Sequence, residues 1–173
     1  MLIKNMIRRG AAVLSAAAMT AALLSGTVFA EGESYEQPEL NPHSKSIIEA
    51  DGYRFIDLNG NGTLDVYEDW RQDAETRAAD LVSQMTAREK IAQMQHPTYL
   101  PRADGKIAPY LQEYCTDYGI GMLLIRELNS VEAAATTMNT IQEYAEASRL
   151  GVPVLVSMDS VHGLSYVSGA TVT

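Results

Sequence analysis

The stretch that decides the fold is Gly151-Val-Pro-Val-Leu-Val-Ser-Met-Asp159-Ser-Val-His162-Gly163. A short apolar run ends here in an acid, and a His-Gly pair follows it. A buried strand of a parallel sheet has this pattern when it carries a carboxylate to the ligand-binding edge of an α/β protein. The pattern therefore predicts a strand over 153–158, with Asp159 at the edge where ligands bind.

A second apolar run and a long amphipathic segment precede that strand. Gly119-Ile-Gly-Met-Leu-Leu-Ile125 is typical of another buried strand. Ser130 is placed to cap a helix over 131–149, and Gly151 is suited to end it. Strand, helix and strand make one βαβ unit, which implies parallel pairing of the two strands. The predicted fold class is α/β.

Two further helices are expected upstream of this unit. One begins at Asp69, with Trp70 the first residue of its apolar face. Thr86-Ala-Arg-Glu89 is a capping box, so a second helix begins there and turns Ile91 and Met94 inward.

The first 30 residues have the pattern of a secretory signal peptide. Lys4, Arg8 and Arg9 precede an apolar stretch over 11–24, and Val28-Phe-Ala30 offers small residues for cleavage. The apolar stretch is too short for a membrane anchor. We therefore expect a bacterial protein that is secreted or periplasmic, with no membrane contact after cleavage.

The rest of the chain divides into a leader and a domain. Segment 31–50 is polar and acidic, and we expect it to be a flexible leader ahead of a domain over 51–173. Within that domain Tyr53-Arg-Phe-Ile56 is typical of a short strand. Residues 97–109 contain three prolines and are expected to form a loop.

Charge and cysteine content narrow the function further. Without the basic residues of the signal peptide, ten Lys and Arg remain against 22 Asp and Glu, a net charge of −12. This excess of acids argues against nucleic acid or an anionic membrane as a partner. Cys115 is the single cysteine, so it forms no internal disulfide and is expected to be a buried thiol.

Asp57-Leu-Asn-Gly-Asn-Gly-Thr-Leu-Asp-Val-Tyr-Glu68 matches an EF-hand-like calcium loop. Oxygen ligands stand at its positions 1, 3, 5, 9 and 12, with a glycine at 6 and an aliphatic residue at 8. With one such loop, a bound Ca²⁺ would be structural, and no cofactor for catalysis is predicted. The alternative interpretation is a loop of Asx turns without metal. The predicted ligands are Asp57, Asn59, Asn61, the Thr63 carbonyl, Asp65 and Glu68.

Asp159 is the candidate ligand-binding residue, although an acid in this place can also cap a helix or anchor a loop. His162 is more typical of a structural histidine than of a catalyst. Glu127 follows the end of the strand 119–125, but a solvated loop acid explains it as well.

The sequence holds no Gly-rich phosphate loop, no metal-spaced His/Cys cluster and no Gly-x-Ser-x-Gly elbow. No catalytic residue is therefore assigned.

Taken in order, these segments resemble the amino-terminal domain of glycoside hydrolase family 3. The resemblance begins at Asp57 and ends at Val172. It is carried by 57–71, 77–94, Gly119-Ile-Gly-Met-Leu-Leu124, 139–163 and Gly169-Ala-Thr-Val172.

The resemblance implies a secreted, exo-acting retaining β-glycosidase of the β-glucosidase or β-xylosidase type. Such an enzyme hydrolyses O-glycosyl bonds of β-linked carbohydrate on a (β/α)₈ TIM-like barrel. It also implies that Asp159 hydrogen-bonds the terminal sugar and is not the nucleophile. The family's nucleophilic Asp, its acid/base Glu and its Lys-His pair have no matching position here.

We therefore expect an incomplete barrel, its opening βαβ portion, preceded by the signal peptide and the EF-hand-like loop and helix. Alone, this chain is expected to be unstable or to aggregate, and to show no glycosidase turnover. One alternative is a secreted, dockerin-like calcium-binding interaction module. Another is a noncatalytic sugar-binding fragment built around Asp159.

Overall fold

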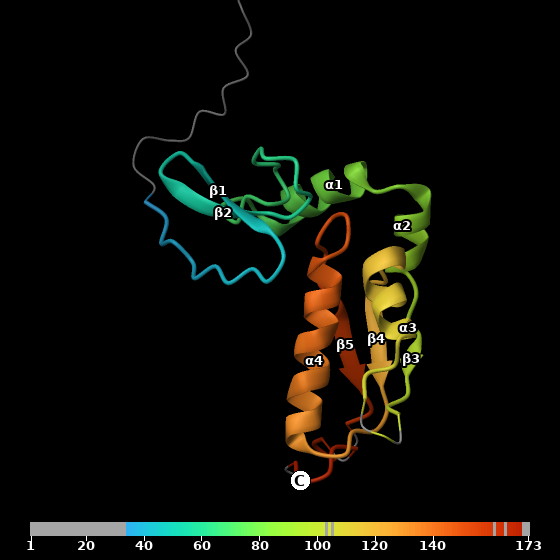
Figure 1. Ribbon diagram of the computed structural model, residues 1–173. Helices are drawn as coiled ribbons and strands as arrows, with labels where there is room; N and C mark the ends of the chain where they lie inside the picture. Colours follow the sequence, from blue (N-terminus) through green and yellow to red (C-terminus); the bar gives the residue numbers. More distant parts are fainter. Residues whose placement is uncertain (1–33, 103, 105, 161, 165, 171–173) are drawn as a thin grey trace, which may run out of the picture. The chain divides into compact units, whose positions relative to one another are not determined.

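The computed structural model describes residues 34–102, 104, 106–160, 162–164 and 166–170. The expected signal peptide, residues 1–30, lies outside the described residues. The chain is mixed α/β: an antiparallel hairpin and two helices lead into a parallel sheet (Figure 1). None of the helices within the described ranges is long and apolar enough to span a bilayer.

The parallel sheet has three strands in the order β3-β4-β5. They are β3 (Thr98–Tyr99), β4 (Met122–Ile125) and β5 (Leu155–Met158). The two expected strands are confirmed in shorter form, because β4 and β5 lie within them. β3 lies in the segment 97–109 that was expected to be a loop, and the Leu124 amide donates to the Pro97 carbonyl at 2.9 Å beside it. Its two residues are too few to show a hydrophobic period.

The helix between β4 and β5 shares a core with the sheet. α4 (Val131–Glu146) begins at Ser130, whose hydroxyl accepts from the Ala133 amide at 3.1 Å, as the sequence predicts. Leu123 and Ile125 of β4 are fully buried and lie in the same apolar cluster as Ile141 of α4. Because side chains alternate along a strand, Leu124 faces the other side of the sheet.

A short helical segment between β3 and β4 completes this core. α3 (Tyr110–Gln112) continues into the π-helix η1 (Glu113–Tyr118). Cys115 lies in the cluster, and burial raises the pKa of its thiol to about 11. A thiol that stays protonated in an apolar core is unreactive, which agrees with the structural role expected for it.

The first long helix begins later than its apolar period indicates. α1 (Ala74–Gln84) is capped by Asp73, whose carboxylate accepts from the Thr76 amide at 2.9 Å. The prediction that this helix begins at Asp69 is therefore wrong. Trp70 lies ahead of the helix and packs elsewhere.

For the next helix, the predicted start is confirmed, but the predicted buried face is wrong. α2 (Ala87–Gln93) has the capping box of Thr86 and Glu89, with both reciprocal hydrogen bonds present. Ile91 and Met94 are 56% and 76% exposed, so the prediction that they turn inward is wrong for the described residues.

An amino-terminal hairpin begins within the segment 31–50 that was predicted to be a flexible leader. β1 (Ser46–Ala50) pairs antiparallel with β2 (Tyr53–Asp57). Asp51 and Gly52 make the turn, with φ angles of 52° and 81°, the left-handed pair that matches the twist of a two-residue hairpin. The last part of the segment 31–50, which was expected to be flexible, is therefore a strand.

Residues ahead of β1 are also tied to the fold. The backbone amides of His43, Ser44 and Lys45 donate to the Glu146 carboxylate at 2.8, 2.7 and 3.1 Å. The Lys45 ammonium donates to the Ser148 carbonyl at 2.8 Å. These contacts join the leader to the carboxyl end of α4.

Candidate functional site

The loop over 57–68 is organised around Asp57, the last residue of β2. Its side chain is buried, and its two carboxylate oxygens accept from the Asn61 and Gly62 amides, each at 3.0 Å. Gly62 has a φ of 77°, a conformation that glycine adopts without strain. The loop therefore turns tightly about the first of its predicted ligands.

The polar side chains of the loop point at one another. The Asn59 and Asn61 side-chain amides both donate to Asp65 Oδ2, at 2.6 and 2.7 Å. Their carbonyl oxygens accept from amides two residues ahead: Asn59 Oδ1 from Asn61 at 3.0 Å, and Asn61 Oδ1 from Thr63 at 2.7 Å. These are Asx turns.

Glu68 closes the loop from its far end. Its buried carboxylate accepts from the Leu58, Asn59 and Asp65 amides at 2.8, 3.2 and 3.0 Å. Burial raises the pKa of Glu68 above its usual value, and these hydrogen bonds oppose the rise without cancelling it. The carboxylates at the first and twelfth loop positions are thus both held by backbone amides of the loop itself.

The structure brings five predicted ligand side chains together, and their oxygens are the hard donors that Ca²⁺ prefers. Among the described residues, no group of three or more His, Cys, Asp and Glu side chains is placed to hold a metal ion. A cation here would therefore depend on the two asparagines and the Thr63 carbonyl as well as the acids. It would also compete with the loop's own amide donors.

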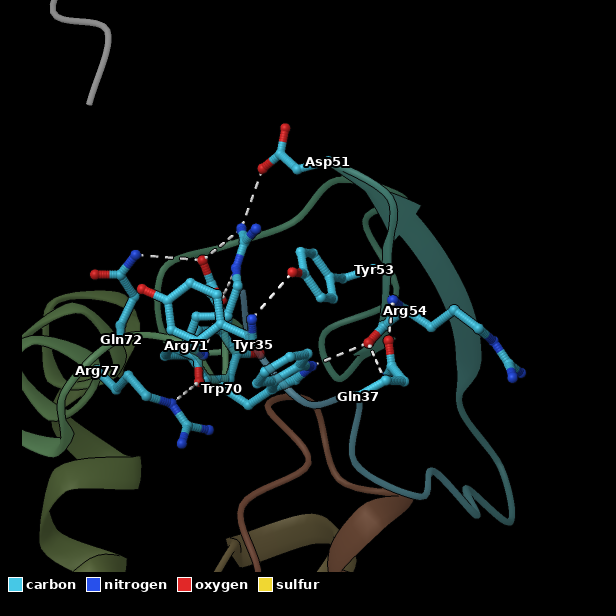
Figure 2. Close-up of polar contacts among 11 residues, drawn as sticks. Tyr35, Gln37, Asp51, Tyr53, Arg54, Trp70, Arg71, Gln72 and Arg77 are labelled. Atoms are coloured by element: carbon cyan, nitrogen blue, oxygen red, sulfur yellow. Dashed lines mark hydrogen bonds and ion pairs between the residues drawn. The ribbon is translucent and has the colours of Figure 1, made fainter. Parts of the chain in front are cut away.

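Residues that flank this loop in the chain form an aromatic cluster that the sequence interpretation missed; Figure 2 shows Tyr53, Trp70 and Arg71 of this cluster. The Arg71 guanidinium lies over the rings of Tyr53 and Phe55, 5.5 and 4.9 Å from their centroids. Asp69 and Asp51 hold it by hydrogen bonds of 2.8 and 3.1 Å. Burial opposes ionisation of Asp69, but the bonds from Arg71 outweigh it and lower the pKa of Asp69.

Trp70 joins the same cluster, which explains why it is not part of α1. Its ring stacks on Phe55 with centroids 5.5 Å apart, and its Nε1 donates to the Arg54 carbonyl at 3.0 Å. The cluster binds the hairpin to the chain that leaves the loop. It is a structural support for residues 57–68. The signal that could have indicated it in the sequence is the pair of aromatic residues Tyr53 and Phe55, two positions apart.

A second group of polar residues lies at the carboxyl ends of the parallel strands. Asp159 directly follows β5, and Arg126 directly follows β4. Arg126 Nη1 lies 3.9 Å from Asp159 Oδ2, and the two side chains are 49% and 47% exposed. The sequence predicts Asp159 at this edge but does not single out Arg126, although it too follows an apolar strand.

Glu127, the other acid at this edge, lines an open groove of about 490 Å³. The segment after β5 pairs there with the chain that follows β4: the Leu128 amide donates to the Tyr166 carbonyl at 3.0 Å, and the Ser168 amide to the Leu128 carbonyl at 3.2 Å. His162 is exposed. The other groove residues are Leu128, Asn129, Tyr166 and Ser168.

A hydrogen bond that the sequence does not indicate crosses the sheet near this edge. His96 Nε2 and Ser157 Oγ are 2.7 Å apart, so a residue just before β3 reaches a residue of β5. Ser157 pairs in register with Leu124, the residue of β4 that faces away from the core. The bond therefore braces the face of the sheet that α4 does not cover.

Comparison with known proteins agrees with this architecture. The family model "Glycosyl hydrolase family 3 N terminal domain" matches residues 86–173, which include the whole parallel sheet and Asp159. The chain is 35% identical over 147 residues to a "Periplasmic beta-glucosidase/beta-xylosidase" from Dickeya chrysanthemi. That alignment covers 80% of this chain and 22% of the relative, so the chain spans about a fifth of the relative's length.

The matched segment carries the strand pattern, the helix α4 and the acid at the end of β5. Because the family model covers half of the chain, the match is not confined to one motif. The chain belongs to glycosyl hydrolase family 3.

Proposed function

We propose that this chain supplies the first part of the catalytic domain of a secreted, exo-acting retaining β-glycosidase. Its reaction would be hydrolysis of O-glycosyl bonds at the end of a β-linked carbohydrate. The order β3-β4-β5 supports the opening of a (β/α)₈ barrel, in which parallel strands follow one another around the axis. The name of the Dickeya chrysanthemi relative supports a β-glucosidase or β-xylosidase specificity.

The observation that carries the proposal is the place of Asp159. It is exposed at the carboxyl end of a parallel strand, which is where barrel enzymes bind their substrates. A carboxylate there accepts charge-assisted hydrogen bonds from sugar hydroxyls and selects against sugars that lack them. We propose substrate binding for Asp159. Retaining hydrolysis needs a pair of carboxylates, a nucleophile and an acid/base, and we assign neither role to a residue described here.

The test is hydrolysis of aryl β-glucosides, β-xylosides and N-acetyl-β-glucosaminides by the protein as its producing cell makes it. Asp159→Asn removes the charge and keeps the shape, so kcat/KM for the preferred substrate should fall by about 10- to 100-fold. Asp104→Asn, at an exposed acid of the loop after β3, is the matched control. A protein that cleaves none of these glycosides would contradict the proposal.

The proposed location is the periplasm or the extracellular medium. It is supported by the relative's description as periplasmic and by the signal pattern of residues 1–30. The intact mass of the protein recovered outside the cytoplasm should show cleavage after Ala30. Protein found in the cytoplasm with residues 1–30 still attached would contradict this location.

We also propose that residues 57–68 bind a structural Ca²⁺. The oxygen-rich donor set supports it, and the ion would supply charge neutralisation for Asp57, Asp65 and Glu68 without taking part in catalysis. The dockerin-like alternative has no support from the comparisons, which match the glycosidase segment of the chain.

A further inference from the structure

Two opposite charges are aligned one step beyond the paired strands. In the register of the sheet Ile125 lies beside Met158, so Arg126 and Asp159 are the next residues on each strand. The arrowheads of β4 and β5 end at the same edge (Figure 1). Each of the two residues directly follows its strand, so the pairing of the strands sets the position of both backbones.

Both side chains belong to the face of the sheet that α4 does not cover. Ile125 and Met158 pack with the core on the α4 side. Since successive side chains of a strand point to opposite faces, the next residues, Arg126 and Asp159, continue the other face. Ser157 lies one pleat below on that face and is fixed by its 2.7 Å hydrogen bond to His96. The pair therefore stands on a braced part of the sheet.

The separation of the pair leaves room for one bridging group. An N–H···O hydrogen bond spans about 2.7–3.2 Å, whereas Arg126 Nη1 and Asp159 Oδ2 are 3.9 Å apart. A hydroxyl can donate to the carboxylate and accept from the guanidinium at the same time. Its oxygen fits between two atoms at this spacing while it keeps an ordinary hydrogen-bond length to each. About half of each side chain is exposed, so solvent and ligand can reach the gap.

We propose that Arg126 and Asp159 together bind a single hydroxyl of the terminal sugar, with Arg126 as a specificity-determining residue. This inference rests on the proposed function, in which Asp159 binds that sugar. The Asp159 carboxylate accepts a hydrogen bond from the hydroxyl, and the Arg126 guanidinium donates a hydrogen bond to the oxygen of the same hydroxyl. The guanidinium holds its N–H donors in a fixed plane. Lysine would keep the positive charge but would not fix the direction of the hydrogen bond.

The experiment measures binding of glucose and of its monodeoxy derivatives by calorimetry, together with KM and kcat for the best aryl β-glycoside. It uses the protein as its producing cell makes it, in four forms: wild type, Arg126→Ala, Arg126→Lys and the control Arg54→Ala. Arg54 has an exposed side chain on β2, so its removal takes away an arginine without touching the sheet edge.

Arg126→Ala should weaken glucose binding by about tenfold or more, the value of a hydrogen bond to a charged group, and Arg126→Lys should recover part of that loss. The deoxy sugar that lacks the bridged hydroxyl loses the contacts to both Arg126 and Asp159, so it should bind more than about tenfold less well than glucose to the wild type, and equally well to wild type and Arg126→Ala. Discrimination at this hydroxyl should therefore fall in Arg126→Ala without disappearing, because Asp159 remains, and general damage to the fold would not produce this effect.

Two outcomes separate this inference from the proposed function. If the wild type cleaves aryl β-glycosides but Arg126→Ala binds and discriminates sugars as Arg54→Ala does, the role of Arg126 is wrong and the proposed function stands. If the wild type neither cleaves a β-glycoside nor binds a monosaccharide, the proposed function is overturned, and the bridge with it.

Discussion

Gly121 stands where the chain turns into β4 and where no side chain fits. A Cβ atom at this position would lie 2.4 Å from the Gln93 carbonyl oxygen and 2.9 Å from Gln93 Cα. The Gly121 amide also donates to the Ala92 carbonyl at 3.3 Å. Because the close atoms belong to the backbone at the end of α2, no change of rotamer relieves the contact.

Gly121→Ala should therefore lower the free energy of unfolding by about 1–3 kcal/mol, the usual cost of forcing atoms into a packed site. Chemical denaturation of the two proteins measures the difference. Adding Gln93→Ala should not restore stability, since the carbonyl oxygen remains. A variant as stable as the wild type would mean that α2 can shift freely against β4.

Glu89 joins the start of α2 to the chain after α4. Its carboxylate accepts from Arg149 Nε at 2.8 Å and Nη2 at 2.6 Å, and from the Thr86 amide at 2.8 Å. Arg149 is the main reason that the pKa of Glu89 falls from its usual 4.5 to about 2. The folded state therefore holds Glu89 ionised at pH values where the unfolded chain would protonate it.

A group with a lowered folded pKa stabilises the fold above its unfolded pKa and loses that effect as the pH falls through the folded value. Glu89→Gln should cost about 1 kcal/mol at neutral pH, a modest value because Arg149 is half-exposed. The deficit should shrink between pH 4.5 and about 2. Thermal denaturation of wild type and Glu89→Gln across this pH range tests the prediction, with Glu75→Gln, at an exposed acid, as the control. A loss of stability that does not depend on pH would refute the electrostatic cause.

At the scale of elements, the loop over 57–68 should respond to calcium. The ion would replace amide donors around Asp57 and Glu68, so its affinity should be modest, with a Kd of about 10⁻⁴–10⁻³ M. Millimolar CaCl₂ should raise the midpoint of thermal unfolding, and MgCl₂ should raise it less. Glu68→Gln should abolish the calcium response, while Asp104→Asn keeps it. The absence of any shift at saturating calcium would favour the interpretation as Asx turns without metal.

The elements that the sequence predicts well are those with local signals. Ser130 predicts the start of α4 because its hydroxyl accepts a hydrogen bond from the Ala133 amide. Thr86 and Glu89 predict the start of α2 in the same way. The strand ahead of Asp159 is clear because it is apolar and ends at an acid. Each signal lies within a few residues of the element that it predicts.

The elements that were missed depend on contacts far along the chain. Trp70 fits the apolar period of α1, but its ring stacks on Phe55 of β2, and the helix begins only after Asp73. β3 has two residues and exists because β4 pairs with it. Arg126 was missed because an arginine after a strand has no local signature; its meaning comes from the register that places it beside Asp159.

At the scale of the whole molecule, large apolar side chains remain open to solvent. Leu155 of β5 is 63% exposed, and Leu100 is 61% exposed. Within the described residues β5 pairs on one side, with β4. An exposed apolar strand edge is a template for association with another chain.

The isolated chain from Glu31 to Thr173 should therefore self-associate at micromolar concentration and show no glycosidase turnover. Size-exclusion chromatography with light scattering gives the test. Leu155→Lys should reduce association, because a charge on an edge strand opposes pairing. Val131→Lys, at an exposed residue of α4, should change it less. A stable monomer of the unmodified chain would contradict this expectation.

The contact between the leader and Glu146 has a consequence for the maturation of the protein by proteases. Glu146 ends α4, where the helix dipole disfavours a negative charge, and the amides of residues 43–45 compensate for it. An exopeptidase that removed residues up to Lys45 would spare both strands of the hairpin and still leave this carboxylate without those amides. His43 thus marks how far the mature amino terminus can be trimmed before the end of α4 begins to fray.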